Sequence, residues 1–280
     1  MTTAPQTKLT QAEKGRAFRA LHERDRAFII PNPWDIGSAR LLAHAGFVAL
    51  ATTSAGYAFS VGKTDNTIDR DEMIAHVAQI AAATDLPVNA DLENGYGDSP
   101  ERAAKTIRLA AEAGACGGSI EDATGKADHP IYEIAHAADR IRAAAETVLA
   151  LPFTFTLTAR AENYLNGRPD IKDTIKRLQA YQEAGANVLY APGLTSKEDI
   201  AAVVSSVDRP TNVLAGLQNA PLTLDELSAL GVKRVSIGSV LSRAAYGAAI
   251  RAATEMREHG TFTFTDEAIS FGDLSAIFKL

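Results

Sequence analysis

Residues 87–121 read PVNADLENGYGDSPERAAKTIRLAAEAGACGGSIE. The apolar run at 87–92 predicts a buried strand, and a second strand is expected over 117–121. Between them, residues 100–113 carry apolar side chains at helical spacing, and Gly114 stands where a helix stop is expected. A strand, a helix and another strand in this order are typical of a parallel βαβ unit.

The same alternation runs along the chain. Strands are expected at Phe28–Pro31, Phe47–Thr52, Pro87–Leu92, Gly117–Glu121, Phe153–Ala159, Asn187–Tyr190, Asn212–Ala215 and Arg234–Gly238. Helices are clearest at Asp71–Ala83, Pro100–Ala113, Ile131–Leu149, Ile171–Ala184, Lys197–Val204, Leu224–Leu230 and Val240–Glu258. Eight strands, each followed by a helix, predict an α/β fold of the (β/α)8 TIM-barrel type. An open doubly wound sheet is disfavoured because no G-x-G-x-x-G turn follows the first strand.

The chain is expected to form one domain, because no low-complexity linker divides its 280 residues. A C-terminal extension, about 261–280, continues past the predicted barrel. Its apolar residues need a partner surface, which its own barrel or a neighbouring subunit would supply. They are Ile269, Phe271, Leu274, Ile277 and Phe278.

Composition excludes several classes of partner. The net charge of −6 and the lack of a basic stripe argue against nucleic acid and anionic membranes as partners. No apolar run approaches about 18 residues, so no membrane span is expected. The first 11 residues are polar and show no signal-peptide pattern, and Cys116 is the single cysteine. A cytoplasmic protein without disulfides is predicted.

Acidic residues gather where the active site of such a barrel lies, at the carboxyl ends of the strands. Asp91 and Glu93 close the third strand, Glu121 closes the fourth, and Asp65 lies in the second loop. Converging carboxylates repel one another unless a cation lies between them, and oxygen ligands favour Mg²⁺, with Mn²⁺ as an alternative. Purely structural roles are the alternatives. Asp91 and Glu93 would then form a solvated strand end, and Asp65 would cap the helix starting near Asp69.

Other residues at these strand ends suit an acidic ligand. Arg160 can clamp a carboxylate through two parallel hydrogen bonds, although a structural salt bridge to Glu162 is also open to it. Asn212 can reach a substrate carboxylate. The expected turn Ser54-Ala55-Gly56 offers a hydroxyl and backbone N–H groups to a second anionic end of the ligand. Alternatively, the Ser54 hydroxyl only forms a hydrogen bond within the turn. Together these residues indicate a site for a small, doubly anionic acid.

Five motifs in order carry a resemblance that covers roughly residues 28–258. They are Thr53-Ser54, Lys63-Thr64-Asp65-Asn66, Asp91-Leu92-Glu93-Asn94-Gly95-Tyr96-Gly97, Ile120-Glu121-Asp122 and Thr158-Ala159-Arg160-Ala161-Glu162. With these motifs the chain resembles the isocitrate lyase/phosphoenolpyruvate mutase superfamily. Glu93 stands where that family usually has an Asp.

The resemblance implies a barrel whose last helix is swapped between subunits of a homodimer or homotetramer. It implies Mg²⁺ bound directly by Asp91, with Asp65, Glu93 and Glu121 acting largely through water. It also implies a 2-oxo acid, or its enolate, held by Ser54, Gly56 and Arg160. A mobile loop after the fourth strand, about 123–130, would close over the site.

Two departures from the family concern proton transfer. The loop reads Ala-Thr-Gly-Lys-Ala-Asp-His-Pro and lacks the catalytic Cys of the family's Lys-Lys-Cys-Gly-His, while Tyr190 stands near the place of the mutase-type His. Lys126 and His129 are therefore the candidate acid/base groups, although a charged loop is more often only solvated. With Arg160 and Glu121 they complete the predicted catalytic set.

The predicted function is a Mg²⁺-dependent lyase that cleaves or decarboxylates a small 2-oxo or 2-hydroxy dicarboxylic acid through an enolpyruvate-like intermediate. Two alternatives stay open. One is hydrolysis of a P–C bond, as in phosphonopyruvate, and the other is a protein that binds Mg²⁺ and a 2-oxo acid without turnover.

Overall fold

A computed structural model describes residues 8–216 and 222–279. Within these residues the strands are β1 (Phe28–Ile30), β2 (Leu50–Ala51), β3 (Val88–Asp91), β4 (Gly117–Glu121), β5 (Thr156–Arg160), β6 (Val188–Tyr190), β7 (Thr211–Leu214) and β8 (Arg234–Ser236). The helices are α1 (Gln11–Leu21), α2 (Ile36–His44), α3 (Ser54–Ser60), α4 (Arg70–Ala83), α5 (Pro100–Glu112), α6 (Ile134–Leu149), α7 (Ile171–Glu183), α8 (Lys197–Ser205), α9 (Leu224–Ala229), α10 (Val240–His259) and α11 (Phe271–Phe278).

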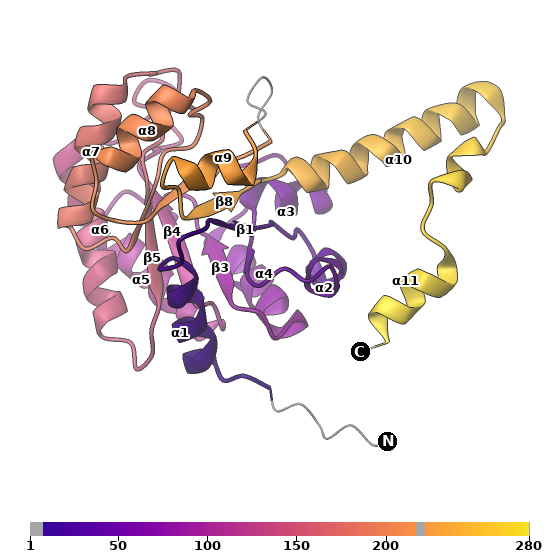
Figure 1. Ribbon diagram of the computed structural model, residues 1–280, viewed down its shortest axis with the longest axis horizontal. Coiled ribbons are helices and arrows are strands. Elements are labelled where there is room, and N and C mark those ends of the chain that lie inside the picture. Colours follow the sequence, from indigo (N-terminus) through magenta and orange to yellow (C-terminus); the bar gives the residue numbers. More distant parts are fainter. Residues whose placement is uncertain (1–7, 217–221, 280) are drawn as a thin grey trace.

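The eight strands are parallel and follow the order β1-β8-β7-β6-β5-β4-β3-β2. The Ala51 N–H donates to the Pro31 carbonyl at 3.1 Å, and this bond joins β2 to the end of β1. The sheet therefore closes on itself, with helices around it (Figure 1). The predicted (β/α)8 barrel is confirmed. Six strands lie within the segments expected from the sequence, while β5 and β7 each extend one residue beyond them, to Arg160 and Thr211.

Several helices differ from the sequence-based expectation. The structure adds α1, α2, α3 and α11, and it starts α6 at Ile134 instead of Ile131. Ile131 instead forms an antiparallel bridge with Ala123, and the Tyr132 N–H donates to the Asp122 carbonyl at 2.8 Å. This local pairing closes the base of the loop after β4, so the helix begins only beyond it.

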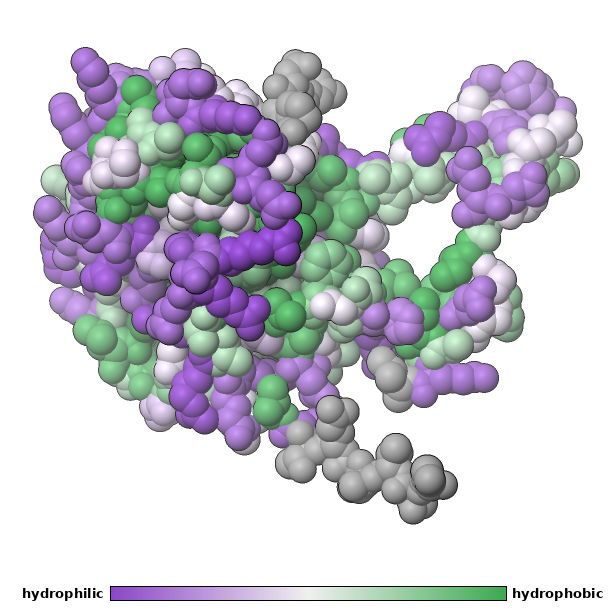
Figure 2. All heavy atoms as spheres, viewed as in Figure 1, coloured by the Kyte–Doolittle hydropathy of each residue, from purple (hydrophilic) through white to green (hydrophobic). Residues whose placement is uncertain are grey.

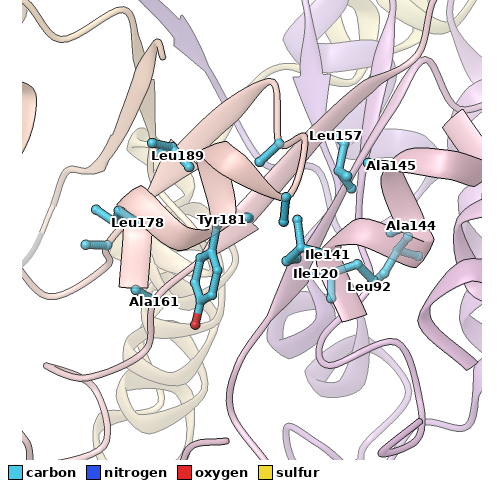
Figure 3. Packing of buried hydrophobic residues seen from close by; sticks show 14 of the residues in the cluster. Leu92, Ile120, Ile141, Ala144, Ala145, Leu157, Ala161, Leu178, Tyr181 and Leu189 are labelled. Carbon is cyan, nitrogen blue, oxygen red and sulfur yellow. The ribbon is translucent and has the colours of Figure 1, made fainter. Parts of the chain in front are cut away.

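The main core lies between the barrel and its helices. Figure 3 shows part of it, where Ile120, Leu157 and Leu189 of neighbouring strands meet Ile141 of α6 and Leu178 of α7. All five side chains are buried. Alanines fill much of the remaining helix surface, which lets the helices approach the sheet closely.

Helix α1 covers the amino-terminal end of the barrel. Its Phe18 and Leu21 pack with Phe28 and Ile30 of β1 in a separate buried cluster. At Gly15 an added Cβ would lie 2.0 Å from the Thr154 carbonyl oxygen, so only glycine permits this approach. The carboxyl ends of the strands are left as the accessible end of the barrel.

The C-terminal segment leaves the barrel. Helix α10 points away from the other helices, and the chain then turns back so that α11 contacts α2 (Figure 1). Figure 2 shows an open space between this arm and the barrel. Among the described helices, none is both long and apolar enough to cross a lipid bilayer.

Candidate active site

A cavity of about 370 Å³ opens at the carboxyl ends of the strands. Its wall includes Asp65, Asp91, Glu93, Glu121 and Arg160. The structure therefore brings together the acids and the arginine that the sequence singled out, from β3, β4, β5 and two loops. Their convergence follows from the barrel, since parallel strands place all their carboxyl ends on one side.

Asp91 is the most heavily bonded of these acids. Its Oδ2 accepts from the Ser54 N–H at 3.0 Å and from the Ser54 hydroxyl at 3.1 Å. Its Oδ1 accepts from Arg160 at 2.9 Å and from the Ser119 hydroxyl at 3.4 Å. The carboxylate is thus held in one orientation at the end of β3.

Arg160 is bound to three carboxylates at once. Its Nη1 pairs with Asp91 at 2.9 Å, its Nη2 with Glu121 at 3.0 Å, and its Nε with Glu162 at 2.8 Å. The guanidinium also lies 5.2 Å from the ring centre of Tyr190. The salt bridge to Glu162 is therefore present, and every nitrogen of the expected substrate clamp already has an acidic partner.

Glu93 lacks such compensation. Its Oε1 is buried and has no hydrogen-bond partner among the described residues, and its backbone adopts φ +48°, a left-handed conformation that is costly outside glycine. Burial, followed by the charges of Asp91 and Asp65, raises the pKa of Glu93 to about 8. This carboxyl therefore needs a positive partner to stay ionised at neutral pH.

Asp65 belongs to the same cluster. It accepts from the Ser54 hydroxyl at 3.2 Å, and burial, with the charge of Asp91, raises its pKa. The alternative role as a helix cap is wrong, because Asp69 caps α4 through the Glu72 N–H.

The donor set fits a hydrated divalent cation. In the described part of the chain no three His, Cys, Asp or Glu side chains already form a ligand cage. Mg²⁺ needs no such cage, because it binds through one or two carboxylates and keeps several waters. Asp65, Asp91, Glu93 and Glu121 are the residues that would hold it. The orphaned Glu93 oxygen and the mutual repulsion of the acids are the observations that support this fit.

The expected turn at residues 54–56 is instead the first turn of α3. Thr53 caps this helix, and its hydroxyl accepts from the Gly56 N–H at 3.2 Å. Ser54 and Ala55 lie on the cavity wall, but Gly56 does not. A Cβ at Gly56 would lie 2.6 Å from Thr53 Cγ2, so close packing accounts for this glycine. Because Ser54 donates to Asp91, its first observed role is to orient that acid.

The two acid/base candidates of the loop after β4 lie off the cavity wall. Lys126 pairs with Asp98 at 2.8 Å on the surface, and His129 is exposed. Ala123 and Gly125 of the same loop do line the cavity. The loop therefore borders the site while its charged side chains face elsewhere.

The polar residues on the wall that received no functional role from the sequence include Asn89, Tyr190 and Arg234. Asn212, which did, also lies there. Its amide bonds Arg234 and Ser236 inside the barrel. A polar or charged residue within a predicted buried strand was the available signal for Asn89 and Arg234, because such a residue needs an internal partner.

Comparisons with known proteins agree with this geometry. The phosphoenolpyruvate phosphomutase family model matches residues 18–257. A 2-methylisocitrate lyase of Bacillus subtilis is 30% identical over 266 residues, which cover 90% of this chain and 84% of that protein. A Burkholderia cenocepacia protein, described only in general terms as a lyase/mutase, is 64% identical with a TM-score of 0.95, covering 96% of this chain and 97% of that one.

A phosphonopyruvate hydrolase solved with oxalate and Mg²⁺ has a TM-score of 0.84 over 95% of this chain and 94% of that one. At 24% identity this likeness concerns the fold alone. The family match and the 2-methylisocitrate lyase carry the assignment, because they span most of the chain. This chain belongs to the isocitrate lyase/phosphoenolpyruvate mutase superfamily, whose members include carbon–carbon lyases.

Proposed function

We propose that this protein is a Mg²⁺-dependent lyase that cleaves or decarboxylates a small 2-oxo or 2-hydroxy dicarboxylic acid through an enolpyruvate-like intermediate. The observation that carries the proposal is the excess of acidic over basic side chains at the cavity. Asp65, Asp91, Glu93, Glu121 and Glu162 line it, against the two arginines Arg160 and Arg234. A divalent cation would balance this charge, and Mn²⁺ is the alternative ion.

The residues have distinct tasks in this proposal. Asp91 is the direct ligand, and Asp65, Glu93 and Glu121 act largely through water. When bound, the ion supplies a Lewis acid for the oxyanion of the enolate. Arg160 fixes Asp91 and Glu121 through its two terminal nitrogens and so sets the distance between β3 and β4 acids.

Proton transfer is assigned to the loop after β4. Ala123 and Gly125 already border the cavity, so closure of residues 123–130 would carry Lys126 or His129 toward it. The ion pair of Lys126 with Asp98 is exposed, and exposed pairs contribute little, so it offers small resistance to such a movement.

The experiment is a product screen by NMR with Mg²⁺, and with EDTA as control. The substrates are oxaloacetate, phosphonopyruvate, methylisocitrate, dimethylmalate and related 2-hydroxy diacids. A chelator-sensitive release of pyruvate or another 2-oxo acid from a carbon substrate supports the lyase. Phosphate released from phosphonopyruvate would instead support the P–C hydrolase.

One observation favours the non-catalytic alternative. In this structure neither Lys126 nor His129 faces the cavity. If no substrate in the screen is turned over while oxalate binds in the presence of Mg²⁺, the lyase proposal gives way to a protein that binds a 2-oxo acid. Binding would then survive the substitution of both residues by alanine.

The C-terminal arm suits a second copy of the chain. Ile250 and Met256 of α10, and Phe262 and Phe271 beyond it, expose apolar side chains. The open space between the arm and the barrel is visible in Figure 2. We propose that a partner subunit covers these residues in a homodimer or homotetramer, with the last helices exchanged.

A further inference from the structure

The amino-terminal side of the same cavity has the opposite charge character. Asn89, Asn212 and Arg234 lie on the cavity wall, and each is the first or second residue of its strand. We call these three residues the cavity floor. Asp91, Glu121 and Arg160, in contrast, are the last residues of β3, β4 and β5. The floor therefore lies deeper along the barrel than the acid cluster.

Arg234 is a buried cation held by neutral groups. The residue is only 3% exposed. Nε donates to Asn212 Oδ1 at 2.9 Å, Nη2 donates to the Thr158 hydroxyl at 3.1 Å, and Nη1 lies 3.5 Å from Nε2 of His22. Among residues 8–216 and 222–279 no carboxylate pairs with it, and residues 1–7 and 217–221 contain no Asp or Glu.

The two arginines of the cavity differ in their charged partners. Arg160 shares its charge with three carboxylates, whereas Arg234 pairs with none in the described part of the chain. Burial lowers the pKa of Arg234 to about 10, with Arg160 adding to the effect and Tyr190 opposing it, so the side chain stays charged at neutral pH. A buried charge without a counter-ion is costly, and an anion from solution would remove that cost.

The neighbours of Arg234 leave room for such an anion. The Asn212 amide donates to Ser236 at 2.9 Å and accepts from Arg234, so it fixes the guanidinium against β7. Nδ2 of Asn89 makes only a long contact, 3.5 Å, with the Ala90 carbonyl oxygen, so this amide still has N–H groups to donate to an anion. The floor is thus polar and positively charged.

We propose that the cavity floor binds the second carboxylate of a dicarboxylic acid, with Arg234 as its counter-ion. This inference rests on the proposed function, since the first carboxylate and the oxo or hydroxy oxygen would face the acid cluster and its ion. The substrate then lies along the barrel axis, with its chelating end outward. Arg234 becomes the residue that selects a diacid over a monoacid of equal length.

The test compares acids that differ only in the second carboxylate. Calorimetric titrations in Mg²⁺ would use 2-oxoglutarate against 2-oxopentanoate, and malate against 2-hydroxybutanoate. We expect the unmodified protein to favour at least one diacid about tenfold or more, because only the diacid can form a charge-assisted pair with Arg234. In Arg234→Met the ratio should fall close to one while the monoacid affinity stays within about twofold.

Two further variants test whether the loss of diacid preference in Arg234→Met has only a structural cause. Arg234→Lys keeps the charge and should retain part of the preference for diacids. Arg19→Met removes a cation that binds Thr156 and Phe155 outside the cavity wall, and it should leave the preference unchanged. A preference that survives in Arg234→Met, or that is absent from the unmodified protein, overturns the inference.

A measurement on the unmodified protein separates this inference from the proposed function. If none of the four acids binds in Mg²⁺, the proposed function fails. Bromide binding then tests the cavity floor independently of that function. Anomalous diffraction from crystals soaked in sodium bromide should show an ion beside the Arg234 guanidinium. In that case, the absence of bromide from the floor overturns the inference.

Discussion

Arg160 Nη1 and Asp91 Oδ1 lie 2.9 Å apart across the carboxyl end of the barrel. The acid expected to bind the metal ion directly is thus already paired with a cation of the protein. The same guanidinium holds Glu121 and Glu162. We therefore expect loss of Asp91 to weaken ion binding and loss of Arg160 to lower the stability of the fold.

Asp91→Asn should weaken Mg²⁺ binding by about 100-fold or more, because an amide carries no charge for the ion, while Ser54 keeps an oxygen to bond. Isothermal calorimetry measures this directly. Asp98→Asn removes an acid that pairs with Lys126 outside the cavity and should leave the affinity unchanged. Equal Mg²⁺ affinity in Asp91→Asn and the unmodified protein would show that the site is misassigned.

Arg160→Met should lower the free energy of unfolding in EDTA by about 3–5 kcal/mol, because three carboxylates lose their shared cation. Mg²⁺ should restore part of this loss, since an ion that binds only the folded state stabilises it. Urea unfolding with EDTA and with Mg²⁺ gives both values.

The matched control is Arg26→Met. Arg26 pairs with Asp225 on the surface, and removal of such a pair costs less than about 1 kcal/mol. If Arg160→Met is as stable as this control, or if Mg²⁺ has no effect on it, the charge balance described for the site is incorrect.

Lys126→Ala should lower kcat by about 100-fold on a substrate found in the product screen, if the loop carries the proton donor. Its stability should not change, because the ion pair with Asp98 is exposed. Lys197→Ala removes another exposed pair, to Glu226, and serves as the control for steady-state kinetics. Unaltered kcat in Lys126→Ala would remove this residue from the catalytic set.

His22 predicts acid sensitivity of the fold. Burial, followed by the charge of Arg234, lowers its pKa from the ordinary 6.5 to about 3. Its Nδ1 lies 2.9 Å from the Phe18 carbonyl oxygen, to which the neutral ring donates. Between these two pKa values the unfolded chain binds a proton that the folded chain does not, so stability is fully present above pH 6.5 and is lost as pH falls.

The expected loss from His22 is about 2 kcal/mol between pH 6.5 and pH 5, at about 1.4 kcal/mol per pH unit. Urea unfolding of His22→Gln should lack this part of the slope. His44→Gln, at an exposed histidine of α2, should keep it. His76 will leave some acid sensitivity in both variants, since burial also lowers its pKa, to about 4. Identical pH slopes in His22→Gln and the unmodified protein would contradict a neutral buried ring.

The C-terminal arm predicts an oligomer. Ile250→Asp places a charge on an exposed apolar position of α10, 64% exposed in the single chain, and should shift the mass measured by light scattering to that of a monomer. Leu149→Asp, at a position 85% exposed on α6, should not change the mass. A monomeric unmodified protein, or an oligomer that survives Ile250→Asp, would count against the proposed covering of the arm.

The sequence by itself determined the barrel and the identity of its acidic end. Strand and helix periods alternate strongly enough to place all eight strands, and parallel strands put their carboxyl ends on one side. The two-residue period of a strand even separates neighbours, since Glu121 faces the cavity while Asp122 pairs with Arg177 outside it. These features are local, so a single sequence contains them.

Only the tertiary structure decided which charges are balanced. The partners of Arg160 come from three separate segments, and Arg234 is left with Asn212, Thr158 and His22, which no local pattern reveals. The first turn of α3 and the surface position of Lys126 likewise depend on contacts with Asp91 and Asp98, distant in sequence. Such pairings follow from strand register around a closed barrel, and a side chain finds its counter-ion only when the barrel closes.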